Sequence, residues 1–153
     1  MSDKVIDYVL RKLSQEQYTG ERHIPKYNWC GSHTSFKDRL NYETMAPKKG
    51  SEPINAIDEA CMLHDLAYYK NKQTYEQLCP VQKREARHNF QEANWRADNE
   101  LVERVKEMHE ADPKASYAIR NTIRVKEWAE KNKLLDTKVF SGIGKKRKTK
   151  RKK

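Results

Sequence analysis

The most constraining feature of this chain is a predicted helix over about residues 55–70 that carries polar side chains at fixed helical spacings. Asn55 is suited to cap its N-terminus. His64 and Tyr68 are four residues apart, so they lie one turn apart on one face. Asp65 is displaced from His64 by about 100° around the axis and points in a neighbouring direction. The helix therefore carries polar side chains on two adjacent faces, and the fold must give both faces polar partners or solvent.

A second long helix is predicted from Pro80 to about Glu110, because apolar residues recur there at helical spacing. Its apolar stripe consists of Phe90, Ala93, Ala97, Leu101, Val105 and Met108. The short connection over residues 71–79 favours antiparallel packing of the two helices. Asp98, in the middle of the second helix, can then meet the face that carries His64. The sequence predicts a mainly α fold with two antiparallel core helices.

Three regions are expected along the chain. Residues 1–14 contain an amphipathic helix with its apolar residues on one face. Residues 15–135 form the main domain. This domain begins with a turn-rich stretch over 15–53, without strand alternation, and ends with a helix over 112–135 that opens on an Asp-Pro N-cap pair. Residues 136–153 are expected to be a flexible basic tail.

The positive charge is concentrated in this tail. The net charge is +10, and eight of the nine residues from 145 to 153 are Lys or Arg, which leaves +2 for residues 1–144. Such a run suits a nuclear import receptor, nucleic acid or an anionic membrane. The charged N-terminus predicts no secretory signal, and no apolar run is long enough for a membrane span.

The residue types at the polar positions suit ester hydrolysis. A neutral histidine such as His64 can take a proton from water, and its second ring nitrogen needs an acceptor, which Asp98 can supply. Tyr68 can hydrogen-bond Asp98 and hold it. A hard dication beside Asp65 would polarise an ester carbonyl, and it prefers oxygen ligands, including backbone carbonyls. The glycine-containing loop over residues 27–33 can turn such carbonyls towards Asp65.

The order of these residues resembles the phospholipase A2 superfamily. The similar motifs are Tyr27-Asn-Trp-Cys-Gly31, Asp58, His64-Asp65-Leu-Ala-Tyr68 and Ala97-Asp98. Together with Pro53-Ile-Asn-Ala-Ile-Asp58, they look closest to the phospholipase domain of parvovirus minor capsid proteins. The resemblance covers roughly residues 24–105 and is specific in order and spacing. It implies a small phospholipase A2-like domain with a calcium-binding loop against its core helices.

The resemblance also implies a role for each matching residue. His64 would activate the water that attacks the sn-2 ester of a glycerophospholipid. Asp98 would orient His64, and Tyr68 would support Asp98. Ca²⁺ would be the cofactor, and its implied ligands are the carboxylate of Asp65 and the backbone oxygens of Trp29, Gly31 and His33.

The same resemblance implies partners and a setting. A phospholipid membrane surface would be the substrate, and its hydrolysis would breach a host membrane during viral entry. Capsid proteins would be further partners. The virion or the host cell, including the nucleus, is then the expected location.

Cys30 and Cys61 occupy positions that are paired in the secreted members of the superfamily. The loop must approach the His64 helix if its carbonyls are to reach an ion held by Asp65. That approach predicts Cα atoms of the two cysteines within about 7 Å of each other. Both a disulfide and two buried thiols in a reducing cell fit this expectation.

Two alternative functions remain open. A phospholipase-like module could bind lipid with little catalytic activity. Alternatively, Cys30-Gly-Ser-His33 and Cys61-Met-Leu-His64 form two C-x-x-H pairs. Such a ligand set could hold zinc in a nucleic-acid-binding module that uses the basic tail. The zinc interpretation gives no role to Asp65, Tyr68 or Asp98.

Overall fold

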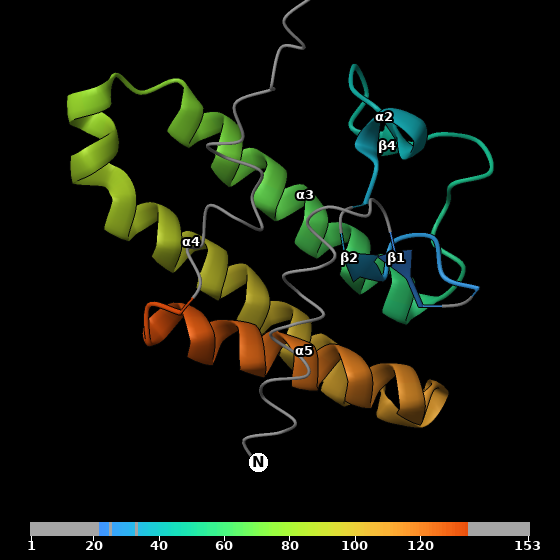
Figure 1. Ribbon diagram of the computed structural model, residues 1–153. Coiled ribbons are helices and arrows are strands. Elements are labelled where there is room, and N and C mark those ends of the chain that lie inside the picture. Colours follow the sequence, from blue (N-terminus) through green and yellow to red (C-terminus); the bar gives the residue numbers. More distant parts are fainter. Residues whose placement is uncertain (1–21, 25, 33, 135–153) are drawn as a thin grey trace, which may run out of the picture.

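The computed structural model describes residues 22–24, 26–32 and 34–134. Three long helices dominate this part of the chain: α3 (Ala56–Glu76), α4 (Pro80–Glu107) and α5 (Pro113–Lys131). Figure 1 shows α3 and α4 side by side and running in opposite directions, joined by a short turn. The prediction of a mainly helical domain with two antiparallel core helices is confirmed.

Capping side chains fix where these helices begin. Asn55 Oδ1 accepts a hydrogen bond from Asp58 N at 2.9 Å at the start of α3. Asp112 Oδ1 accepts one from Ala115 N at 3.1 Å at the start of α5. Both contacts satisfy backbone amides that have no partner within the helix. The predicted helix starts at Asn55 and Asp112 are therefore confirmed.

The predicted helix ends are less accurate. α3 continues past residue 70 to Glu76, because Tyr75 is buried and its ring stacks on Phe90 of α4 at 4.7 Å between centroids. α4 ends at Glu107, and the 3-10 turn η1 (His109–Ala111) leads into α5. α5 ends at Lys131, earlier than the expected residue 135. Tertiary packing, which helical periodicity does not reveal, decides where α3 ends.

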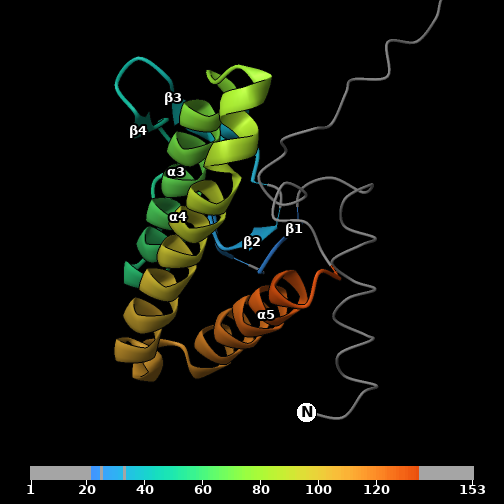
Figure 2. The same cartoon turned by 90° about the vertical axis from the view of Figure 1, so that its left-hand side faces the viewer.

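The hydrophobic core lies where α3, α4 and α5 meet the N-terminal loop. Its buried members include Trp29, Leu40, Ile57, Leu101, Val105, Ile119 and Ile123. The stripe predicted on α4 is buried at Phe90, Ala97, Leu101 and Val105, whereas Ala93 and Met108 are half-buried. Figure 2 shows α5 crossing the α3–α4 pair at an angle. This crossing brings α5 within contact of both the loop and the core helices.

The stretch before α3 contains short strands that the sequence did not reveal. β1 (Arg22–His23) pairs antiparallel with β2 (Gly31–Ser32), and β3 (Leu40–Asn41) pairs with β4 (Ala46–Pro47). A single turn of helix, α2 (Phe36–Arg39), precedes β3. Each strand has two residues, too few for an alternating pattern to appear. The β1–β2 pair closes the loop that contains Tyr27, Trp29 and Cys30.

Some expectations concern residues outside the described ranges. These are the amphipathic helix over 1–14, the basic tail over 136–153 and the loop residue His33. Within the described residues, no helix is long and apolar enough to cross a bilayer.

Candidate active site

The centre of the site is a hydrogen-bonded trio from α3 and α4. His64 Nε2 lies 2.7 Å from Asp98 Oδ1, and the Tyr68 hydroxyl donates to the same oxygen at 2.7 Å. A carboxylate can only accept, so the histidine carries its proton on Nε2 in this contact. The Asp98 side chain is fully buried and that of His64 is 10% exposed. The structure thus brings together the three residues that the sequence proposed as catalytic.

A fourth residue of this cluster was not predicted from the sequence. Lys126, from α5, donates to Asp98 Oδ2 at 2.8 Å and to the Tyr68 hydroxyl at 2.6 Å. Burial raises the pKa of the Asp98 carboxyl, but hydrogen bonds and charges from His64 and Lys126 outweigh it, so the pKa falls below its ordinary value. Asp98 is therefore ionised, and both of its oxygens are engaged.

Asp65 lies beside the other nitrogen of the imidazole. His64 Nδ1 is 3.6 Å from Asp65 Oδ1, longer than a hydrogen bond but within ion-pair range. Burial lowers the pKa of His64, but Asp65 and Asp98 more than compensate and raise it to about 9. With a pKa of about 9, the ring is mostly protonated at neutral pH. The neutral base expected from the sequence thus requires a further positive charge near Asp65.

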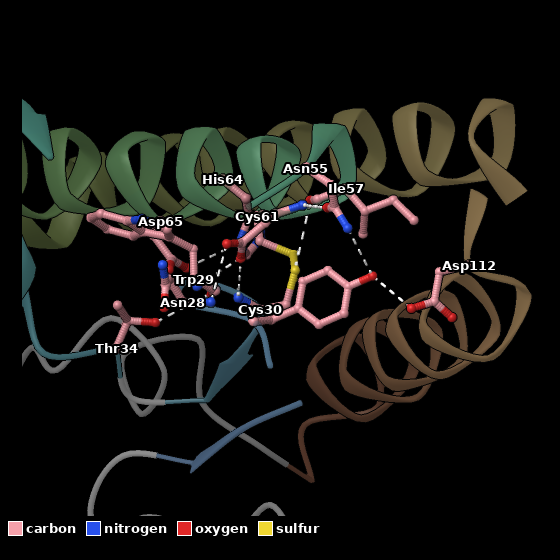
Figure 3. Close-up of a disulfide and its surroundings, with 12 residues drawn as sticks. Asn28, Trp29, Cys30, Thr34, Asn55, Ile57, Cys61, His64, Asp65 and Asp112 are labelled. Carbon is pink, nitrogen blue, oxygen red and sulfur yellow. Dashed lines mark hydrogen bonds and ion pairs between the residues drawn. A yellow bond between two sulfur atoms is a disulfide. The ribbon is translucent and has the colours of Figure 1, made fainter. Parts of the chain in front are cut away.

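The loop before α3 is held to the helix by one carboxylate. Asp58 is fully buried, and its two oxygens accept hydrogen bonds from four backbone amides, those of Asn28, Trp29, Cys30 and Ile54. These bonds are 2.7–3.2 Å long. Asp58 belongs to the motif that carries the resemblance, but its place in the sequence does not reveal this contact. Figure 3 shows the loop lying along the helix that carries Cys61, His64 and Asp65.

A disulfide joins the same loop to the same helix. Cys30 and Cys61 are bonded through their sulfurs, with Cα atoms 5.1 Å apart. The predicted proximity of the two cysteines is confirmed, and the open alternative of two free thiols does not hold in this structure. Because both sulfurs are bonded to each other, they cannot serve as zinc thiolates. The zinc interpretation loses two of its four ligands.

The chain matches a family model described as a phospholipase A2-like domain, over residues 20–126. This match covers more than half of the chain, from the loop to Lys126. The chain belongs to the phospholipase A2-like domain family. Membership supports a phospholipase-like function for the site around His64. Neither a curated protein nor a solved structure matches the sequence significantly.

A phospholipase A2-like domain is generally calcium-dependent, and the residues here fit such an ion in part. The Asp65 side chain is 17% exposed, so it is close to the surface on the side of the loop. Trp29 and Gly31 both lie in the loop that Asp58 and the disulfide hold against α3. Within the described residues, no three His, Cys, Asp or Glu side chains form a metal cluster. Beside the Asp65 carboxylate, a calcium ion would accept backbone carbonyls of the loop as ligands.

The buried side chain of Trp29 fixes the part of the loop that carries its backbone carbonyl. The indole is fully buried, and its Nε1 donates to the carbonyl of Ser51 at 2.7 Å. The Trp29 carbonyl itself faces the Thr34 hydroxyl at 3.4 Å. The bulky residue is thus accommodated in the core, where it anchors the loop. Gly31 lies in β2 and is exposed.

A small pocket also touches His64, from the side of α4. Its other lining residues are Ala60, Leu63, Ala67, Ala97, Glu100, Leu101 and Arg104. Leu63 and Ala67 each lie two residues from Asp65, about 200° around the helix axis. The pocket is therefore on the side of His64 away from Asp65.

Proposed function

We propose that this protein is a calcium-dependent phospholipase A2, which hydrolyses the sn-2 ester of glycerophospholipids. The observation that carries the proposal is the buried His64–Asp98 pair, at 2.7 Å, with Asp65 on the other side of the same imidazole. Ester hydrolysis needs a base that activates water and a positive charge that polarises the ester carbonyl. His64 can act as the base, and Asp65 lies beside it where it can hold the positive ion. Membership in the phospholipase A2-like family supports the reaction class.

The two nitrogens of His64 have different tasks in this proposal. Nε2 is engaged with Asp98, so Nδ1 is the nitrogen that can take a proton from water. Asp98 stabilises the positive charge that the ring acquires and keeps the ring in one orientation. The Tyr68 hydroxyl holds Asp98 Oδ1 from the second side. In this proposal, the residues expected to be catalytic keep the roles that the resemblance implies.

Calcium would be held by the Asp65 carboxylate together with the backbone oxygens of Trp29, Gly31 and His33. When bound, it supplies the positive charge that polarises the ester carbonyl. Neutralising the charge of Asp65 also weakens the influence of one of the two side chains that raise the pKa of His64. The ring then comes closer to the neutral form that a base requires. Asp65 therefore has two tasks: it is an ion ligand and it adjusts the proton affinity of His64.

The substrate partner in this proposal is a phospholipid membrane surface. Release of fatty acid and lysophospholipid weakens a bilayer, which is the step that the resemblance to parvoviral capsid domains implies for host entry. The residues that act on the lipid are supplied by α3, α4 and the loop. The basic residues 145–153 are not part of the reaction.

The decisive test is release of labelled fatty acid from phosphatidylcholine liposomes labelled at either the sn-1 or the sn-2 position. We expect sn-2 release with calcium and none with a chelator. His64→Gln should lower turnover by at least about 100-fold, the usual loss for a general base. His88→Gln is the matched control, since His88 is 74% exposed on α4 and pairs only with the surface residue Glu92 among its described contacts.

Three results would contradict the proposal. Turnover of the His64→Gln protein equal to the wild type would exclude His64 as the base. Equal turnover with chelator would exclude the ion. Binding to the liposomes without release of either label would identify a lipid-binding module instead of an enzyme.

A further inference from the structure

The inward face of α5 carries two charged residues in place of apolar ones. Ile119, Ile123, Lys126 and Glu130 follow one another at spacings of four, three and four residues, so they share one helical face. All four are buried, Lys126 at 4% and Glu130 at 3% exposure. A lysine and a glutamate are almost never fully buried unless they are paired. Both side chains therefore need charged or hydrogen-bonding partners inside the core.

The partner is the catalytic carboxylate. The Lys126 ammonium donates to Asp98 Oδ2 at 2.8 Å, to the Tyr68 hydroxyl at 2.6 Å and to Glu130 Oε1 at 2.6 Å. These three acceptors match the three hydrogens of an ammonium group. Tyr68 in turn donates to Asp98 Oδ1, which closes a ring of hydrogen bonds around the carboxylate. Asp98 is thus held at both oxygens, and Oδ1 faces His64 Nε2.

Glu130 resolves an electrostatic problem that the lysine creates. A cation beside Asp98 would by itself cancel the negative charge that Asp98 offers to His64. With Glu130 at 2.6 Å, the trio of Asp98, Lys126 and Glu130 keeps a net charge of −1. The lysine can therefore fix the position of Asp98 while the group as a whole stays negative.

We infer that Lys126 and Glu130 form a charge-neutral positioning pair for the catalytic dyad, in which Lys126 fixes Asp98 and Tyr68 and Glu130 fixes Lys126. The inference rests on the proposed function and adds α5 to the machinery that α3 and α4 supply. Neither residue touches the reacting ester in this assignment. They act through Asp98, by keeping Oδ1 directed at His64.

The test compares four variants with the wild type: Lys126→Met, Glu130→Gln, the double variant and Lys131→Met. Lys131→Met is the matched control, because Lys131 forms an i,i+4 pair with Glu127 on the same helix at 2.9 Å and its side chain is 54% exposed. The double variant keeps the net charge of −1 but lacks the ammonium. It separates a loss of positioning from a change of charge.

The first measurement is liposome hydrolysis per folded molecule, with the folded fraction determined by circular dichroism. Lys126→Met and the double variant should lower kcat by on the order of 10- to 100-fold and leave KM within about twofold, as for a misplaced catalytic group. Lys131→Met should leave both constants unchanged. Recovery of kcat in the double variant would show that only the charge matters and would overturn the positioning role.

The second measurement is independent of hydrolysis. The proton on His64 Nε2, bonded to buried Asp98, should give a downfield proton resonance in the wild type and in Lys131→Met. It should shift or broaden in Lys126→Met and in the double variant. An unchanged resonance in folded Lys126→Met protein would refute the inference. If the wild type shows this resonance and no hydrolysis, the proposed function fails while the positioning role is still decided.

Discussion

An Asp58→Asn substitution keeps the shape of the side chain but replaces one carboxylate oxygen by an amide group. Asp58 is fully buried, and each of its oxygens accepts two backbone amides: Oδ1 those of Trp29 and Cys30, Oδ2 those of Asn28 and Ile54. Whichever way the new amide turns, two backbone donors then face another donor. We expect this single atom change to loosen the loop from α3.

The magnitude follows from the number of bonds lost. A hydrogen bond to a charged group contributes about 1.5–3 kcal/mol, so losing two of the four lowers the free energy of unfolding by roughly 3–6 kcal/mol. The two remaining bonds also change from a carboxylate to a neutral acceptor, which adds to the loss. Total stabilities of domains are about 5–15 kcal/mol, so the effect is large.

Urea unfolding followed by circular dichroism, under oxidising conditions that preserve the Cys30–Cys61 bond, measures this loss. Glu59→Gln is the matched control. Glu59 is the next residue in the first turn of α3 and is exposed, so its removal should cost at most about 1 kcal/mol through the helix dipole. A loss below about 1 kcal/mol for Asp58→Asn would refute the assignment of this carboxylate as the anchor of the loop.

Four further predictions concern other parts of the chain. In chelator, the His64 pKa measured by NMR should be about 9 and should be lower in Asp65→Asn; an equal pKa in both proteins would contradict the role given to Asp65. The pKa of His64 in the folded state lies above the unfolded value of 6.5, so protonation of His64 stabilises the fold by roughly 3 kcal/mol. This stabilisation is complete below pH 6.5 and is lost as the pH rises to about 9. Urea unfolding of the wild type and of His64→Gln across that pH range measures the difference. Replacing Cys30 and Cys61 together by serine should lower the free energy of unfolding by roughly 3–4 kcal/mol, whereas Cys79→Ser, at an exposed free cysteine, should change it little. Deleting residues 145–153 should leave hydrolysis of neutral micelles intact but change the location of a fluorescent fusion; nuclear accumulation of the truncated form would exclude the import role.

Local sequence was sufficient for the parts of the site that lie on regular helices. Asn55 and the spacing of His64, Asp65 and Tyr68 are properties of one helix, and they do not depend on what packs against it. The short connection before Pro80 favours antiparallel packing of the second helix against the first, so the contact between Asp98 and His64 was also predictable. The motif order around these residues led to the family that the comparison confirms.

The contributions of the loop and of α5 were decided only by tertiary structure. Asp58 lies in the first turn of α3, but its four amide partners come from a loop whose path no periodicity describes. Lys126 and Glu130 continue the apolar register of Ile119 and Ile123, which was a readable sign of inward-facing charge. Which carboxylate they would meet depends on the crossing of α5 over α4, and that angle is set by side-chain packing across the whole core. The sequence by itself thus determined the dyad on its two helices. The groups that position the dyad lie far apart along the chain, so only the packing of the loop and α5 against α3 and α4 brings them together.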